Sequence, residues 1–241
     1  MQNQFDPRQP AVNTATVGVP RAARDVGLRS YMLSVYNYMT SGILLTGIVA
    51  MLFANSGYAA QVMATPLRWL IILAPLGFVM AMSFGLNRMS TSTLQALFWS
   101  FAVAMGLSMS TIFLVYTGMS IATTFFAVSA GFAGLSLWGY TTKKDLSGWG
   151  TFLIMGVVGL LVAMLINLFL QSPAMMLVIS ALGVLIFAGL TAYDTQKIKS
   201  MYAHVAGTDM MGKVVIMGAL NLYLDFINMF MFLLSFMGDR R

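Results

Sequence analysis

Two aspartates, Asp194 and Asp225, lie inside long apolar stretches of this chain. An ionised carboxylate in hydrocarbon is costly unless it takes up a proton, so such residues usually line a cavity or an ion pathway. The chain has no glutamate. Its other acids all fall in predicted tails or loops: Asp6, Asp25, Asp145, Asp209 and Asp239. Asp194 and Asp225 are therefore the candidate functional residues.

Two carboxyl groups that meet inside a membrane can do one of three things. They can share a proton, bind a hard cation such as Ca²⁺ together with carbonyl, Asn and Thr oxygens, or activate a water molecule. Burial and like charge both oppose the doubly ionised pair, so we expect one proton to be shared over some range of pH. The two aspartates can approach each other if the helix that carries Asp194 extends to about Met201.

Polar side chains continue along the helical faces that carry the two aspartates. Side chains three and four residues apart share one face of a helix. The supporting polar residues on these faces are Thr191, Thr195, Asn221 and Asn228. Each aspartate also has a simpler interpretation. Asp194 would be a solvated acid beside Lys197 and Lys199 at a helix end, and Asp225 would be a buried structural group.

The composition excludes a soluble protein. The chain of 241 residues is 59% hydrophobic and 8% charged, with a mean hydropathy of +0.83. No charged residue occurs within residues 30–67, 69–87, 89–142 or 146–193. About 20 apolar residues cross a bilayer core, so the longer stretches must each contain two helices. The chain is predicted to be an integral membrane protein in contact with the lipid bilayer.

Turn-forming residues divide the apolar sequence into seven predicted spans. The breaks include Asn55-Ser56-Gly57, Thr117-Gly118 and Gln171-Ser172-Pro173. The predicted spans are residues 31–53, 67–86, 94–116, 121–140, 149–170, 174–198 and 214–237. The predicted fold class is thus an all-α membrane protein, a bundle of seven transmembrane helices. Residues 30–241 form the membrane domain, and residues 1–29 form a disordered basic cytoplasmic tail.

The distribution of lysine and arginine predicts the orientation. With the N-terminus in the cytoplasm, most of the 13 basic residues lie on the cytoplasmic side. They are Arg8, Arg21, Arg24, Arg29, Arg88, Lys143, Lys144, Lys197, Lys199 and Lys213, against Arg68, Arg240 and Arg241 on the other side. Positive charge favours the cytoplasmic side, so the prediction is N-in and C-out. This topology also explains the net charge of +6 without a nucleic-acid partner.

Enzymes that work inside membranes match the sequence poorly. Tyr193-Asp194 resembles half of an intramembrane aspartyl protease site, but the segment before Asp225 lacks the two glycines of the other half. The only histidine, His204, lies in a predicted loop, which excludes a rhomboid-like Ser/His site. Lys213 stands at the start of the seventh span instead of its middle, where a retinal protein would need it. We therefore expect no enzyme activity and no cofactor.

Two runs of sequence resemble the Bax inhibitor-1 family, specifically its bacterial YccA-like branch. They are Leu190-Thr191-Ala192-Tyr193-Asp194-Thr195-Gln196-Lys197-Ile198-Lys199 and Leu220-Asn221-Leu222-Tyr223-Leu224-Asp225-Phe226-Ile227-Asn228. The resemblance covers the chain from about Leu28. It implies six helices around a central seventh, in the inner membrane of a bacterial cell.

The resemblance also implies roles for individual residues. Asp194 and Asp225 would form a pH-sensing dyad, with Ca²⁺ as the ion that they gate and contact. An arginine at the end of the second span would latch one aspartate in the closed state. Arg88 is the candidate for this latch, although a direct alignment can place Asn87 there.

Two functions of different classes are therefore expected. The first is a pH-sensitive leak channel for calcium or another cation. The second is a regulatory protein that restrains a membrane-anchored ATP-dependent protease, with the N-terminal tail as the contact. Alternatively, the tail is only a topology anchor.

Overall fold

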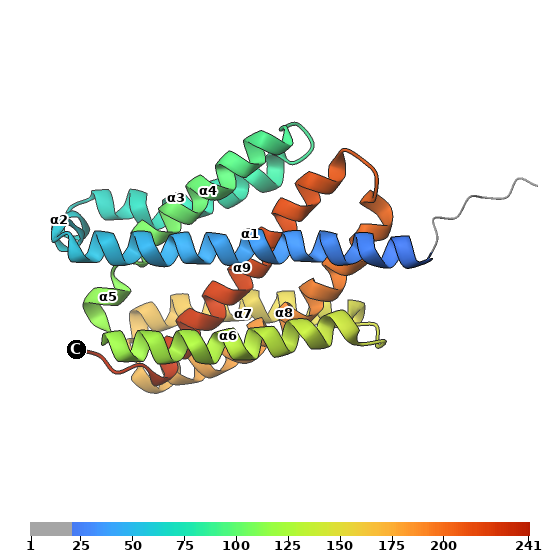
Figure 1. The fold of residues 1–241 in the computed structure, drawn as a ribbon. Helices are drawn as coiled ribbons and strands as arrows, with labels where there is room; N and C mark the ends of the chain where they lie inside the picture. The colour runs from blue at the N-terminus through green and yellow to red at the C-terminus, as the bar shows by residue number, and fades with distance from the viewer. Residues whose placement is uncertain (1–20) are drawn as a thin grey trace, which may run out of the picture.

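The computed structural model describes residues 21–241, and this part of the chain is built from helices (Figure 1). The first helices are α1 (Arg21–Asn55), α2 (Tyr58–Met63), α3 (Leu67–Gly85), α4 (Thr91–Met109) and α5 (Ile112–Val115). The remaining helices are α6 (Gly118–Thr141), α7 (Ser147–Leu170), α8 (Pro173–Val205) and α9 (Met210–Met237).

Seven segments of the described chain are long and apolar enough to cross a membrane, as the sequence predicts. They are α3, α6, α7, α8, α9, the part of α1 from Asp25, and α4 together with α5. The short helix α2 was not predicted. Nothing in the structure tests which side faces the cytoplasm, so the N-in, C-out orientation stays a prediction.

Two helices extend well beyond their predicted ends. α1 begins at Arg21, so the last part of the predicted tail is helical, while residues 1–20 lie outside the described part of the chain. α8 continues to Val205 and thus includes the charged residues that follow Asp194. The ring of Tyr202, in the extension of α8, packs on that of Tyr31 in α1 with centroids 5.4 Å apart, which ties the extension of α8 to α1.

Side-chain caps define where several helices begin. Ser90 accepts a hydrogen bond from the Thr93 amide at the start of α4, and Ser172 accepts one from the Met175 amide at the start of α8. Ser and Thr at these positions satisfy backbone amides that have no partner inside the helix. Pro173 then occupies the first turn of α8, where its missing amide hydrogen costs nothing.

The last helix, α9, lies at the centre of the bundle. It packs against α8, α1, α6 and α4, whereas α3 packs on α4 and α7 packs on α8. In its most apolar window 72% of the residues are buried, against 11–33% in the other spans. The predicted central seventh helix is thus confirmed.

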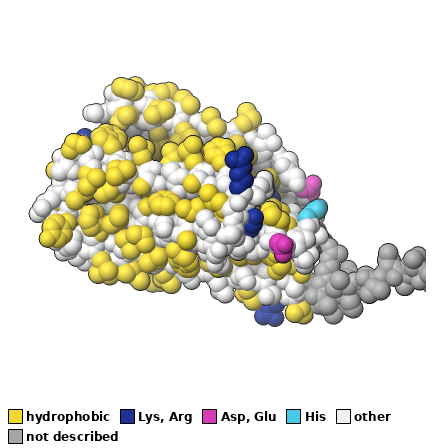
Figure 2. Space-filling view, turned by 90° about the horizontal axis from the view of Figure 1, so that it is seen from above, with side chains coloured by type: hydrophobic (Ala, Val, Ile, Leu, Met, Phe, Trp, Pro, Cys, Tyr) yellow, Lys and Arg dark blue, Asp and Glu magenta, His cyan; other side chains and the backbone are white. Residues whose placement is uncertain are grey.

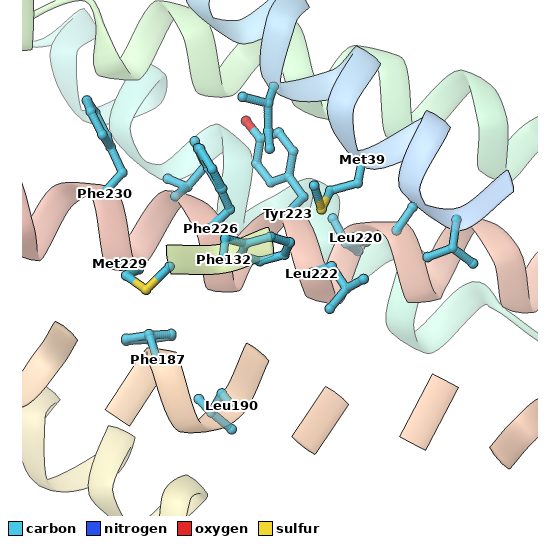
Figure 3. Packing of buried hydrophobic residues seen from close by; sticks show 14 of the residues in the cluster. Met39, Phe132, Phe187, Leu190, Leu220, Leu222, Tyr223, Phe226, Met229 and Phe230 are labelled. Atoms are coloured by element: carbon cyan, nitrogen blue, oxygen red, sulfur yellow. The ribbon is translucent and has the colours of Figure 1, made fainter. Parts of the chain in front are cut away.

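Side chains from several helices converge on α9 (Figure 3). Phe132 of α6 packs edge to face on Phe226, with ring centroids 5.5 Å apart. On the opposite side of α9, Phe187 of α8 stacks on Phe232 at 5.8 Å. Met229, one turn after Asp225 on the same face of α9, is buried among these helices. The burial of α9 on several sides fixes its position.

The outer surface of the bundle is suited to a bilayer. Figure 2 shows hydrophobic side chains spread over much of one face, while most of the charged side chains in view gather at the end where the described chain begins. Large apolar residues such as Phe84, Phe126 and Phe169 are among the most exposed. Exposed apolar surface of this extent is what lipid contact requires.

Candidate functional site

Asp194 and Asp225 are carried by the two helices that pack most extensively in the described chain, α8 and α9. Asp225 lies near the middle of α9 and is only 4% exposed, and Asp194 is half-buried. The carboxyl group of Asp194 interacts electrostatically with that of Asp225. The structure therefore places the two carboxyl groups within electrostatic reach of each other, on neighbouring helices.

The environment of Asp225 offers little to stabilise a negative charge. Its Oδ2 atom is buried and has no hydrogen-bond partner among the described residues. Buried charges in proteins are normally paired or hydrogen-bonded, and an unpartnered carboxylate in a membrane costs several kcal/mol. The carboxyl group is therefore poised to hold a proton or to meet a cation.

Asp194 has one positive neighbour, Lys197, which follows it by about one turn of α8. The Lys197 ammonium also lies 5.9 Å from the centre of the Tyr193 ring. Lys199 is engaged elsewhere, because its Nζ donates to the Tyr140 carbonyl at 2.6 Å. Since α8 continues to Val205, Asp194 lies within the helix and not at its end, which argues against the simpler interpretation of a helix-end acid.

The four supporting polar residues lie on the expected helices, but the hydrogen bonds that their side chains make are not to Asp194 or Asp225. Asn228 Nδ2 donates to the Leu224 carbonyl, and the Thr191 hydroxyl donates to the Phe187 carbonyl, each at 2.8 Å.

Thr195 is buried, and its hydroxyl lies 3.5 Å from that of Ser136 on α6, while Asn221 is half-buried. These residues supply oxygens near the pair without holding either carboxyl group in this structure.

The candidate latch residue, Arg88, lies in the turn between α3 and α4 and is exposed. Among the described residues, the charged groups that act on the two aspartates are each other and Lys197. The structure therefore does not bring Arg88 to the pair, and the latch stays a prediction. The basic residue that joins this turn to the central helix is Lys213, whose Nζ donates to the Leu86 carbonyl at 3.3 Å.

A buried hydrogen-bond network two residues before Asp225 was not predicted from the sequence. The hydroxyl of Tyr223, two residues before Asp225, lies 2.7 Å from the hydroxyl of Thr46 on α1. The Thr46 hydroxyl also donates to the Ala102 carbonyl on α4 at 2.8 Å. Thr46 is one of two threonines in the apolar first span, and nothing in the sequence named its partner.

A cavity of about 540 Å³ lies between α7, α8 and α9, on the side of Asp225 toward the C-terminal end of α9. Its lining is mainly apolar but includes Asn228, Ser235 and Arg240. Asn228 is less than one turn beyond Asp225, so the cavity begins next to the turn that carries the carboxyl group. A second pair of hydroxyls, Ser180 and Ser235, lies 3.2 Å apart beside it.

The described residues contain no group of three or more His, Cys, Asp or Glu side chains that could hold a metal ion. Any cation at the pair would have two carboxylates, with the rest of its ligands from carbonyl, amide or hydroxyl oxygens. The number of charged ligands sets the affinity of calcium sites, so this donor set suits weak binding.

The seven apolar spans define a multi-pass membrane protein, with an acidic pair on its two most extensively packed helices. The family model described as "Inhibitor of apoptosis-promoting Bax1" matches residues 28–241. The chain therefore belongs to the Bax inhibitor-1 family, as the two sequence runs around Asp194 and Asp225 predict.

Relatives from several bacteria match almost the whole chain. A protein of Rickettsia prowazekii is 48% identical over 219 residues, which cover 90% of this chain and 92% of the relative. The inner membrane protein YbhL of Escherichia coli K12 is 44% identical over 226 residues, covering 92% and 95%. A protein of Caulobacter vibrioides is 44% identical over 230 residues, covering 90% and 91%.

Proposed function

We propose that this protein is a pH-sensitive leak channel for calcium or a similar cation, gated by Asp194 and Asp225. One observation carries the proposal: the carboxyl group of Asp225 is buried at the centre of the bundle, one of its oxygens has no hydrogen-bond partner in the described part of the chain, and Asp194 interacts with it electrostatically. Ionisable groups at such positions in membrane proteins are associated with ion pathways and proton relays.

The gating step follows from the electrostatics of the pair. With one shared proton, a hydrogen bond between the carboxyl groups ties α8 to α9. When that proton leaves, two negative charges repel each other in a medium of low dielectric constant, or a divalent cation bridges them. Either event changes the interface between the two helices, which is the most extensive in the bundle. The proton thus selects between two arrangements of the same helix pair.

The cation path proposed here runs through the cavity beside Asn228. This cavity leads from the turn that carries Asp225 toward Arg240 near the end of α9. Asp194, the other member of the pair, is half-buried on α8, and Lys197 follows it by about one turn. A passing ion must bind weakly enough to leave, which agrees with a site of only two carboxylates. Calcium is therefore treated as the transported ion and not as a resident cofactor.

The test is a calcium-flux assay with purified protein in liposomes over a range of pH. Wild type should show a flux that changes with pH, and Asp225→Asn, which has nothing to ionise at that position, should show a flux independent of pH. The control is Asp209→Asn, which removes an exposed carboxylate from the turn before α9 and should keep the pH dependence. A pH dependence of Asp225→Asn equal to that of wild type would remove the pair from the mechanism.

The same proposal includes location and the absence of catalysis. The match to the inner membrane protein YbhL, together with seven apolar spans, supports a place in the inner membrane of a bacterial cell. The two aspartates act here by charge and proton binding alone, so we infer a non-enzymatic protein without a cofactor.

Restraint of a membrane-anchored ATP-dependent protease remains a separate proposal, to be tested separately. It depends on the tail, of which residues 1–20 lie outside the described part of the chain. Deleting residues 2–20 and measuring the proteolysis of a membrane substrate tests it. Restraint that survives the deletion would exclude the tail as the contact.

A further inference from the structure

A long groove lies on the outside of the bundle between α1 and α6. Within the described residues these two helices pack on α9 but not extensively on each other, and Figure 1 shows α9 crossing between them. The groove has a volume of about 610 Å³, and Phe226 of α9 forms part of its lining. Leu33, Leu44 and Leu137 on its edges are more than half exposed, so the groove opens toward the membrane.

The groove is apolar along its length and basic at one end. Most of its lining is apolar, but Arg29 of α1 lies at one end. Tyr140 of α6 lies at the same end, since α1 and α6 run in opposite directions past the groove (Figure 1). The Lys199 ammonium is 4.8 Å from the centre of the Tyr140 ring and brings a second positive charge to this end. The groove therefore has apolar walls along its length and two basic side chains at one end.

The dimensions match one leaflet of a bilayer. From Arg29 to Leu44, α1 rises by about 22 Å. Half of the hydrocarbon core is about 15 Å thick, so the length of the groove leaves several ångströms for a headgroup at its basic end. The apolar length and the basic end of the groove together suit an acyl chain that carries an anionic headgroup.

We propose that this groove binds an anionic phospholipid, with an acyl chain along α1 and α6 and the phosphate at Arg29. Basic residues near a membrane surface attract anionic headgroups, and apolar walls suit an acyl chain. The lipid would rest against Phe226, which directly follows Asp225 in α9. The proposal concerns lipid binding and does not depend on calcium conduction.

Native mass spectrometry of the purified protein tests the proposal, with phosphatidylglycerol and phosphatidylcholine of identical acyl chains as the probes. Wild type should retain phosphatidylglycerol in preference to phosphatidylcholine. Arg29→Gln should reduce that preference about fivefold, the effect of one basic residue near an anionic surface. Arg29→Lys should keep it, as should Lys143→Gln, which removes an exposed charge from a loop outside the groove.

Two alanines of α6 provide a matched steric test. Ala133 lines the groove, and Ala130 is exposed on the same helix without lining it. Ala133→Phe should abolish retention of both lipids, and Ala130→Phe should leave it unchanged. Retention by Ala133→Phe at the wild-type level would overturn the proposal, as would an unchanged preference in Arg29→Gln. Loss of a protein dimer in Ala133→Phe, without loss of lipid, would assign the groove to a second copy and would equally overturn it.

Discussion

The hydroxyl of Tyr223 on α9 lies 2.7 Å from the hydroxyl of Thr46 on α1, and both side chains are buried. Thr46 gives its own hydrogen to the Ala102 carbonyl, so Tyr223 must be the donor between the two hydroxyls. This contact joins three helices at a position two residues from Asp225. It fixes the rotation of α9 about its own axis and thereby helps to aim the Asp225 carboxyl group.

The direction of this hydrogen bond predicts unequal costs for its two partners. Tyr223→Phe removes the donor and leaves Thr46 bonded to Ala102, so it should lower the free energy of unfolding by about 0.6 kcal/mol. Thr46→Val leaves the Tyr223 hydroxyl buried without a partner and should cost about 1–3 kcal/mol. Unfolding by SDS, followed by tryptophan fluorescence, measures both. A larger loss for Tyr223→Phe would contradict the assigned direction.

The close approach of α6 to α8 depends on Gly139. A methyl group there would meet the Ala192 carbonyl, two residues before Asp194, and this obstacle is backbone that cannot rotate away. Gly139→Ala should therefore destabilise the protein by about 1–3 kcal/mol through overpacking. Gly134→Ala is the control, because a methyl group at this position of the same helix has open space. Equal melting temperatures for the two variants would show that α8 moves aside freely.

The side-chain amide of Gln196 holds the loop between α6 and α7 against α8. Its Oε1 accepts from the Leu146 amide and its Nε2 donates to the Lys144 carbonyl, each at 2.8 Å. Gln196→Leu should release the loop and speed amide hydrogen exchange at residues 142–146, because backbone groups lose their partners. Gln196→Glu keeps the acceptor and should give an intermediate rate. Exchange in Gln196→Leu as slow as in wild type would rule out this role.

The same loop offers a measurable ionisation outside the membrane spans. Hydrogen bonds from the Ser147 hydroxyl and backbone amide hold the pKa of Asp145 below its usual value. A lowered pKa stabilises the folded loop above the usual pKa of aspartate, and this contribution is lost as the pH falls through the lowered value. Ser147→Ala should raise the pKa of Asp145 toward its ordinary value, as measured by carboxyl NMR. Ser200→Ala, which removes an exposed hydroxyl from α8, should leave it unchanged.

The number of spans and the central place of the seventh could be predicted, because hydropathy and length set the spans and the family resemblance indicates the arrangement. The length of α8 was predicted too short, since the apolar run ends before Lys199 and the residues that follow are mostly polar. Contacts that only the fold supplies keep this segment helical, among them Lys199 with the Tyr140 carbonyl and Tyr202 with Tyr31. Hydropathy alone does not contain such contacts.

The two aspartates could be found from sequence because a charged residue in an apolar stretch is conspicuous. The spacing of three and four residues also placed their polar companions on the right helices. What the sequence could not show is how side chains on different helices meet. Arg88 follows its helix closely in sequence but lies exposed in a turn, while Thr46 reaches Tyr223 across 177 positions of the chain.

The central position of α9 has a consequence for how the protein is made. α9 follows every one of its packing partners along the chain, so it leaves the ribosome after them. During biogenesis the earlier spans therefore enter the bilayer before their inner faces have a packing partner, and the insertion of α9 completes the core.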